Sequence, residues 1–245
     1  LFITSEFNHK FYINDNIAVC FYTTGHMLGA ACTYLEIKEN GKITRIAYTG
    51  DIGRQHSYLL PTPENFPQCD YLITESTYGS RIHEPEEDAQ NLLLQTVYNT
   101  CVEKRGKLII PSFAVGRCQE ILYVLNQLYN EHKLPSIKVF VDSPLAINAT
   151  GVFLAHTEYL NDNVRRTMLY DDDPFSFNNV TYIRDVEKSK ALNKYRKPCI
   201  IISASGMLEA GRVKHHVANN IMKPQNTILM VGYCSPTTLG ARIQE

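Results

Sequence analysis

Three side chains with metal-binding chemistry follow apolar, strand-like runs near the start of the chain. His26 lies in TTGHMLGA, Asp51 in AYTGDIGR and Glu75 in YLITESTYG. Imidazole nitrogen and carboxylate oxygen suit zinc and similar divalent metals, and a carboxylate that follows a buried strand needs hydrogen bonds or a cation. Taken singly, His26 is more simply a hydrogen-bonded histidine at a strand end, and Asp51 a turn residue bonded to its own backbone. Because catalytic zinc usually takes about three protein ligands or more, the pattern predicts part of a metal site.

Serine, threonine, glycine and arginine side chains recur after the apolar runs of the rest of the chain. The turns that carry them read PSFAVGRCQE, VDSPLA, ISASGMLEAGR and VGYCSPTTLG. Ligands bind at the C-terminal ends of strands in open α/β sheets, and hydroxyls, guanidinium groups and helix N-termini favour anions. Each turn alone is better explained by helix capping, but the four together predict a track for phosphate groups. The candidate residues are Ser112, Arg117, Ser143, Ser203, Ser205, Gly206, Arg212, Thr237, Thr238 and Gly240.

The secondary-structure elements that must position these residues follow two different patterns, one in each part of the chain. Residues 1–75 read as a meander of mostly antiparallel strands, with an Asn-Gly hairpin signal at Asn40 and Gly41. From about residue 84, short apolar strands alternate with helices, which predicts a largely parallel sheet covered on both faces. The polar segment 169–197 is expected to be an irregular excursion between two strands.

The helices and strands of this second region follow from hydrophobic spacing. The helix that begins at residue 84 has acidic residues in its first turn, where they suit the helix dipole. His215 and His216 fall on a helix whose apolar face carries Val213 and Val217, and His215 is expected to be solvated. Helices are expected over 84–104, 115–132, 146–156 and 210–221, and strands over 107–113, 137–143, 198–205 and 226–233.

Composition excludes several classes of protein. The chain has 245 residues, 44% apolar content and a formal net charge of −1, so any phosphate site must be local rather than a product of overall charge. The seven cysteines form no Cys-x-x-Cys pair, which favours reduced core thiols in a cytoplasmic protein. No apolar run approaches the roughly 18 residues of a membrane span, and the N-terminus does not resemble a signal peptide.

The motifs together resemble those of metallo-β-lactamase-fold nucleases. GHMLGA, YTGDIGR and ESTYG are similar to that fold's third and fourth metal motifs and the acidic motif that follows them. PSFAVGRCQE, DSPLA, SASGMLEAGR and VGYCSPTTLGARI resemble the cap domain of the β-CASP subfamily, which includes the cleavage and polyadenylation endonuclease and many bacterial and archaeal ribonucleases. The resemblance runs from about residue 20 to the C-terminus. It implies an α/β protein in which 1–83 is the second part of a metallo-β-lactamase αββα fold. Residues 84–245 would form a β-CASP domain, cut short at its C-terminus, with a mainly parallel sheet flanked by helices.

The resemblance also implies roles for single residues. His26 matches a histidine that ligates one zinc, Asp51 an aspartate that bridges two zincs, and Glu75 an acidic residue that orients a histidine near the scissile phosphate. The family's His-x-His-x-Asp-His motif and its two later histidines are absent, and they would lie before residue 1 and beyond residue 245. The residues implied to contact the RNA backbone are Ser112, Arg117, Ser143, Ser205, Gly206 and Arg212.

The function implied is zinc-dependent hydrolysis of RNA phosphodiester bonds, either internally or from an end. Two zinc ions in the intact protein would activate a bridging water and clamp phosphate oxygens. The implied partner is single-stranded RNA, the implied location is the cytoplasm, and a homodimer is expected from exposed strand edges. Residues 1–245 alone are expected to be inactive. Two alternatives remain open: a hydrolase of a small ester or thioester, which the cap loops disfavour, and a catalytically dead homologue that binds RNA or acts as a scaffold.

Overall fold

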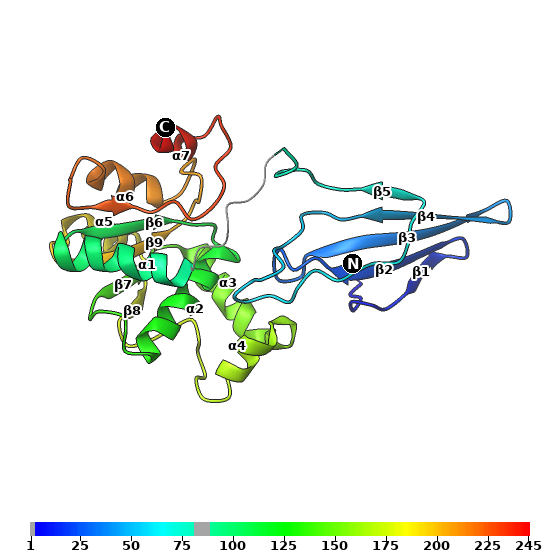
Figure 1. The fold of residues 1–245 in the computed structure, drawn as a ribbon, viewed down its shortest axis with the longest axis horizontal. Helices are drawn as coiled ribbons and strands as arrows, with labels where there is room; N and C mark the ends of the chain where they lie inside the picture. The colour runs from blue at the N-terminus through cyan, green and yellow to red at the C-terminus, as the bar shows by residue number, and fades with distance from the viewer. Residues whose placement is uncertain (1–2, 81–88) are drawn as a thin grey trace. The chain divides into compact units, whose positions relative to one another are not determined.

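A computed structural model describes residues 3–80 and 89–245. These residues form two compact units (Figure 1). Unit 1 contains 3–80 together with Glu158–Arg165, and unit 2 contains 89–157 together with Arg166–Glu245. The domain boundary expected between residues 83 and 84 lies outside the described residues.

Unit 1 is built on a sheet in which each strand pairs with the next along the chain, in the order β1-β2-β3-β4-β5. The first four strands form the antiparallel meander that the sequence predicts, whereas β5 pairs parallel to β4. Asn40 and Gly41 both have positive φ, 49° and 75°, as the hairpin turn between β3 and β4 requires. The strands are β1 (Phe11–Asn14), β2 (Ile17–Thr23), β3 (Ala31–Glu39), β4 (Lys42–Tyr48) and β5 (Tyr71–Ile73).

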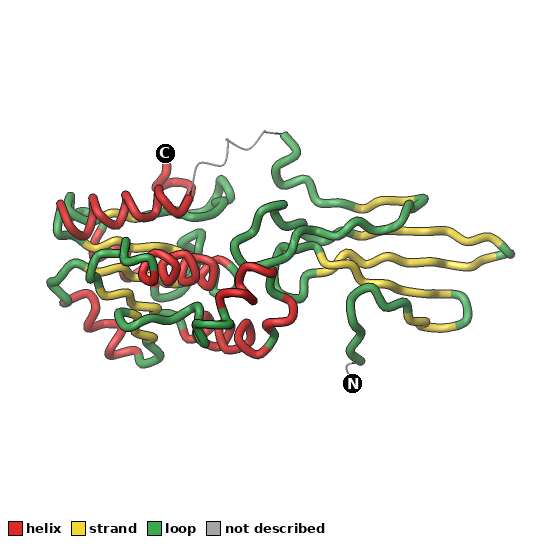
Figure 2. Tube along the Cα trace, turned by 60° about the horizontal axis from the view of Figure 1, so that its bottom comes forward, coloured by secondary structure: helices red, strands yellow, loops and turns green. Residues whose placement is uncertain are grey.

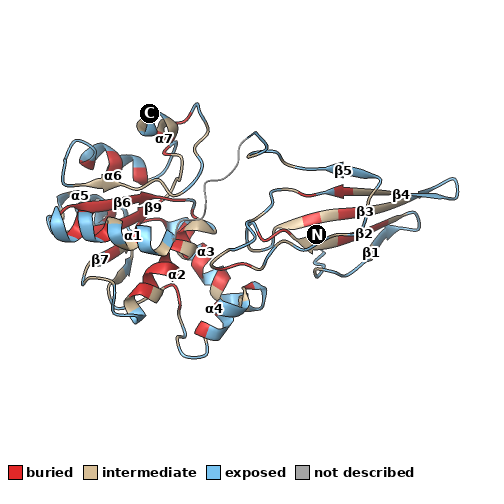
Figure 3. Cartoon of the chain, in the orientation of Figure 1, coloured by how far each residue is buried: buried red, intermediate tan, exposed pale blue. Residues whose placement is uncertain are grey.

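The two faces of this sheet differ in their cover. On one face Cys32, Tyr34 and Ala47 are buried against Phe66 and Cys69. The opposite face carries an apolar row, one residue from each strand, whose exposure increases from β2 to β5. Val19 of β2 is 3% exposed, whereas Tyr71 of β5 is 64% exposed. Figure 3 draws β5 in the colour of exposed residues. The row consists of Phe11, Val19, Leu35, Ile46 and Tyr71.

Unit 2 is built on a parallel sheet of order β10-β6-β9-β7-β8. Every residue of β6 and β9 is buried, so the centre of the sheet is covered on both faces, as the unbroken apolar runs predict. Figure 2 shows helices on both sides of these strands. The strands are β6 (Lys107–Pro111), β7 (Lys138–Val141), β8 (Val180–Tyr182), β9 (Cys199–Ser203) and β10 (Thr227–Ile228).

Amphipathic helices cover the sheet of unit 2. Leu192 from α5 and Val213 and Val217 from α6 pack with Ile109 and Ile201 of the sheet in one core cluster. No helix among residues 3–80 and 89–245 is long and apolar enough to cross a bilayer. The helices of the described residues are α1 (Ala89–Val97), the π-helix η1 (Tyr98–Glu103), α2 (Arg117–Asn130), α3 (Pro144–Ala155), the 3-10 turn η2 (Thr157–Tyr159), α4 (Asp162–Thr167), α5 (Val186–Lys194), α6 (Val213–Asn220) and α7 (Leu239–Gln244). Most of η2 and α4 falls in the segment Glu158–Arg165, which belongs to unit 1.

Two expectations about the elements are wrong. The strand expected over 226–233 is only two residues long, Thr227–Ile228. The segment 169–197 is not irregular throughout, because it contains β8 and α5, and β8 joins the sheet beside β7. Neither β8 nor α5 has a hydrophobic pattern strong enough to be predicted from the sequence. The strand has only three residues, and α5 buries only Ser189 and Leu192. The acidic first turn expected for the helix that begins at residue 84 lies outside the described residues.

Candidate functional site

Three loops of unit 1 meet at one edge of its sheet. Because β2, β4 and β5 run in the same direction, the loops that follow them emerge together. The backbone N–H of Gly53 donates to the carbonyl of Thr24 at 2.8 Å, and the N–H of Ile52 donates to Oε1 of Glu75 at 2.7 Å. These bonds join the loops that carry His26, Asp51 and Glu75.

His26 and Asp51 face one another across this junction. His26 Nε2 lies 3.7 Å from Asp51 Oδ2, and their side chains are 39% and 68% exposed. Glycines allow the approach, since a Cβ at Gly53 would overlap the carbonyl of Gly25, and a Cβ at Gly25 would overlap the carbonyl of Pro61. The glycines that flank the two candidate ligands therefore have a structural reason to be there.

Glu75 is held as an ionised acceptor. The backbone N–H of Ile52 is the largest influence lowering the pKa of the Glu75 carboxyl, followed by the side chain of Thr77, and the nearby His26 ring lowers this pKa further. A carboxylate in this state orients donors around it. Its bond to Ile52 fixes the loop that carries Asp51.

The chemical types of the His26 and Asp51 side chains suit a divalent metal. An imidazole nitrogen and a carboxylate oxygen within a few ångströms of one another are ligands that zinc accepts. They supply fewer ligands than a catalytic zinc site usually has. Within the described ranges, no group of three or more His, Cys, Asp or Glu side chains is gathered closely enough to hold an ion.

The strand-end loops of unit 2 also meet at one edge. The N–H of Ser112, after β6, donates to the carbonyl of Ser203 in β9 at 3.1 Å. The N–H of Asp142, after β7, donates to Ile202 in β9 at 2.9 Å. The last of the four predicted turns joins them, because Gly240 N donates to Met207 O at 3.0 Å.

The predicted phosphate-binding residues of unit 2 differ in how accessible they are. The side chains of Ser112 and Ser143 are buried, and Ser143 Oγ caps α3 by accepting from Ala146 N at 3.2 Å. Ser205 and Gly206 are half-buried, and the ring of Phe113 lies against the Gly206 backbone. Capping thus accounts for Ser143, whereas Ser205 and Gly206 remain accessible at the edge.

Arg117 and its neighbour Gln119 organise the turn after β6. Arg117 forms an ion pair with Glu120 one turn along α2, and its side chain is 27% exposed. Gln119, which sequence reasoning missed, is completely buried. Its Nε2 lies within hydrogen-bond distance of Ala114 O, Ala146 O and Thr150 Oγ1, and its Oε1 accepts from Gly116 N at 2.8 Å.

Arg212 is bound inside unit 2 rather than extended into solvent. Its Nη1 donates to Asp142 Oδ1 at 2.7 Å and to Ile183 O at 3.3 Å, and its Nη2 donates to Arg184 O at 2.7 Å. His216, for which the sequence suggests no role, is 1% exposed and bonds the same carboxylate, while His215 is exposed as expected. The only sequence signal for His216 is its place on the apolar face of α6.

Part of the sequence that forms these two sites matches a known protein family. A family model described as the Beta-Casp domain matches residues 118–243, more than half of the chain. The chain belongs to the β-CASP family. The match begins in α2 and covers β7 to β10 with the loops that follow them, so the family and the α/β fold class that the motifs predict are confirmed.

Curated relatives extend the likeness of this β-CASP chain to unit 1. It is 33% identical over 227 residues to a ribonuclease of Thermus thermophilus, covering 93% of this chain and 51% of the relative. It is 36% identical over 236 residues to an RNase J-like protein of Methanocaldococcus jannaschii, covering 95% of this chain and 53% of the relative. It is 32% identical over 229 residues to the cleavage and polyadenylation specificity factor 73 of Drosophila melanogaster, of which it spans 32%. The chain thus spans about half the length of the first two relatives.

Proposed function

We propose that this chain is part of a metal-dependent ribonuclease that hydrolyses phosphodiester bonds of single-stranded RNA. The observation that carries the proposal is the convergence of His26, Asp51 and Glu75 on bonded loops at one edge of the unit 1 sheet. Membership of the β-CASP family and relatives named as ribonucleases support the reaction class.

The unit 1 residues have separate tasks in this proposal. His26 and Asp51 hold the metal, for which zinc is the expected ion and two ions the expected number in the intact protein. A bound metal there supplies an activated water and neutralises charge that develops on the phosphate. Asp51 and Glu75 are the catalytic candidates of this chain. Glu75 orients groups at the reacting phosphate, because its carboxylate is ionised and already fixes the Asp51 loop.

The unit 2 edge binds the RNA backbone in this proposal. Arg117, Ser205 and Gly206 are the accessible members and contact phosphates directly, while Ser112 and Ser143 contribute through the backbone of their loops. Arg212 is also a predicted member of this edge, but its guanidinium is already bonded to Asp142 and to two backbone carbonyls. Phosphate contacts of this kind position a strand without reading its sequence, so weak sequence preference is expected.

The test uses the purified product of the complete gene. Its cleavage of a 5′-end-labelled single-stranded RNA is measured with and without a chelator. Chelator should abolish cleavage and added zinc should restore it, because the water and the phosphate both depend on the metal. Cleavage of a circular RNA of the same sequence indicates internal cutting, and resistance of the circle indicates cutting from an end. An Asp51→Asn preparation, purified identically, controls for contaminating nuclease.

Two outcomes contradict the proposal. Tight RNA binding without cleavage in zinc, manganese or magnesium would make the protein an RNA-binding homologue that has lost catalysis. Cleavage of a small ester or thioester with no action on RNA would make it a hydrolase of small substrates. The cytoplasmic location, the homodimer and the inactivity of residues 1–245 alone stay predictions.

A further inference from the structure

Asp142 is a fully buried acid at the C-terminal end of β7, next to the proposed RNA-binding residue Ser143. Its backbone is bonded on both sides. Its N–H donates to Ile202 O at 2.9 Å, and its carbonyl accepts from Ser203 Oγ at 2.8 Å. The residue is therefore fixed to the neighbouring strand β9 before its side chain is considered.

Both carboxylate oxygens of Asp142 are also bonded. Oδ1 accepts from Arg212 Nη1 at 2.7 Å, while Oδ2 bonds the Ser189 hydroxyl and lies 2.6 Å from His216 Nε2. Burial raises the pKa of the Asp142 carboxyl, but hydrogen bonds from His216, Ser189 and Arg212 outweigh burial and leave this pKa below its ordinary value. Asp142 is thus an ionised carboxylate that has exchanged water for protein donors.

The cluster is not a hydrolytic triad. Ser189 donates to the carboxylate and not to the histidine, and both Ser189 and His216 are buried. A nucleophilic serine needs a base within hydrogen-bond reach and access to substrate. Among residues 3–80 and 89–245, His216 Nδ1 is buried and has no hydrogen-bond partner, and the ring bonds Asp142 through Nε2.

The geometry of the cluster links two of the proposed RNA-binding loops. Arg212 and His216 lie one helical turn apart at the start of α6, so Asp142 bonds this turn through both of its oxygens. Arg212 ends the loop that carries Ser205 and Gly206. That loop is closed by its own backbone, through Ser205 N to Ala210 O. The carboxylate therefore sets the position of the loop relative to β7 and Ser143.

We propose that Asp142, held by Ser189 and His216, is a positioning residue that sets the spacing between the Ser143 turn and the Ser205–Gly206 loop for binding of successive RNA phosphates. The inference rests on the proposed function. It assigns Arg212 to the framework of the site, since the Arg212 guanidinium already bonds Asp142 and two backbone carbonyls. Preorganised loops bind phosphate without an ordering cost at the moment of binding.

The decisive experiment measures whether Asp142→Asn strengthens or weakens RNA binding. Asp142→Asn removes a negative charge beside the proposed phosphate track, and electrostatics alone would tighten RNA binding. Loss of positioning predicts the opposite, a Kd raised about tenfold, because the amide cannot accept from all three donors. The measurement is fluorescence anisotropy of a labelled single-stranded RNA with the product of the complete gene, in chelator so that no cleavage occurs.

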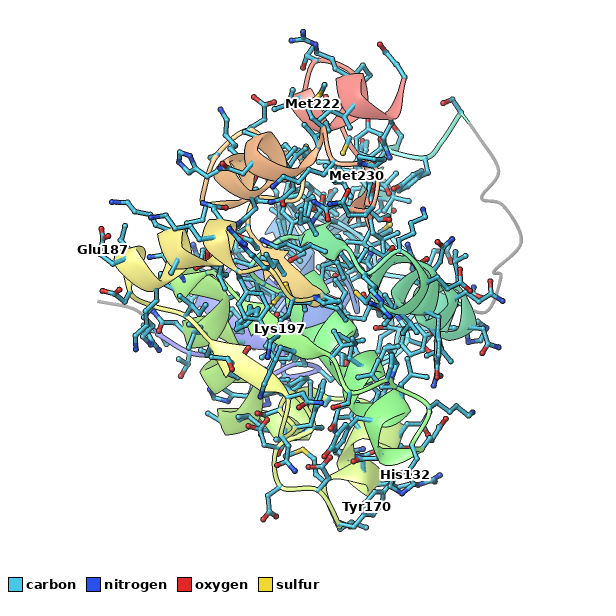
Figure 4. All side chains as sticks on the ribbon, turned by 90° about the vertical axis from the view of Figure 1, so that its left-hand side faces the viewer. His132, Tyr170, Glu187, Lys197, Met222 and Met230 are labelled. Carbon is cyan, nitrogen blue, oxygen red and sulfur yellow. The ribbon has the colours of Figure 1, made fainter. Side chains whose placement is uncertain are left out.

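A matched control removes the same charge elsewhere in unit 2. Glu187 lies on α5, as Ser189 does, but its side chain is 77% exposed and points away from the body of the unit (Figure 4). Glu187→Gln should leave RNA affinity unchanged or slightly higher. With metal present and rates measured over a range of RNA concentrations, Asp142→Asn should raise KM and keep kcat within about threefold of the unaltered protein, because the metal ligands lie in unit 1.

A histidine pair tests the cluster if Asp142→Asn does not fold. His216→Gln retains a donor at the position of Nε2 and should bind RNA within about twofold of the unaltered protein, whereas His216→Phe should bind about tenfold more weakly. Binding by Asp142→Asn as tight as the original, or equal weakening by both histidine variants, overturns the inference and leaves the proposed function standing. An unaltered protein that neither binds nor cleaves RNA removes the proposed function and this inference with it.

Discussion

Gln119 shows how one buried amide holds two turns of the candidate site together. It joins the turn after β6 to the first turns of α3 through Ala146 and Thr150. Gln119→Leu keeps the approximate volume but leaves buried donors and acceptors unpaired, so it should lower the free energy of unfolding by about 2–4 kcal/mol. Urea unfolding followed by circular dichroism measures the change.

The control for this substitution is Gln95→Leu, on the exposed side of α1. It makes the same chemical change without burying a polar partner and should alter stability by less than about 0.5 kcal/mol. Equal midpoints for the two variants would show that the Gln119 bonds contribute little.

Side chains that carry chemistry differ in how visible they are in the sequence. His26, Asp51 and Glu75 were predicted because each follows a strand and lies close to glycine, and the structure brings their loops together. Asp142 and His216 were not paired in advance, because 74 residues separate them and nothing local specifies a partner. Helical periodicity places His216 on an apolar face, but it cannot predict that this face contacts a carboxylate.

The same contrast holds for helices and strands. β6 and β9 were predictable because a buried parallel strand must be apolar on both faces. β8 and α5 were missed because the edge of a sheet and a mostly exposed helix need few apolar residues. Register is set by tertiary pairing, so the parallel alignment of β5 with β4 was also beyond the sequence pattern.

The apolar face of the unit 1 sheet predicts self-association of the 245-residue chain. Tyr48, Tyr71 and Ile73 lie on this face and are each more than half exposed. Ile73→Lys places a charge within the patch and should reduce association, which sedimentation velocity over a tenfold concentration range would measure. Leu72→Lys is the matched control, because Leu72 pairs with Ala47 and so points to the opposite face. A chain that is monomeric throughout, or equal effects of both lysines, would contradict the prediction.

Two compact units with different chemistry suggest a division of tasks in the complete protein. The candidate metal ligands His26 and Asp51 belong to unit 1, and the phosphate-binding candidates belong to unit 2. A formal net charge of −1 gives no general attraction for RNA, so affinity must come from local groups such as Arg117. Substitutions of the unit 1 candidates should therefore change cleavage and bound metal, whereas substitutions of the unit 2 candidates should change RNA affinity.

A pair of substitutions and their combination test this division. Asp51→Asn should abolish cleavage and lower bound zinc while RNA affinity persists, whereas Arg117→Gln should weaken RNA binding about threefold to tenfold, reduce its salt dependence and spare the zinc. The double variant should bind RNA as weakly as Arg117→Gln alone, because Asp51→Asn is expected to leave RNA affinity unchanged and the effects of independent substitutions add. Arg165→Gln is the control, since Arg165 also pairs with an acid three residues away but is not a binding candidate. If Arg117→Gln empties the metal site or unfolds the protein, Arg117 supports the fold and the two tasks are not separable.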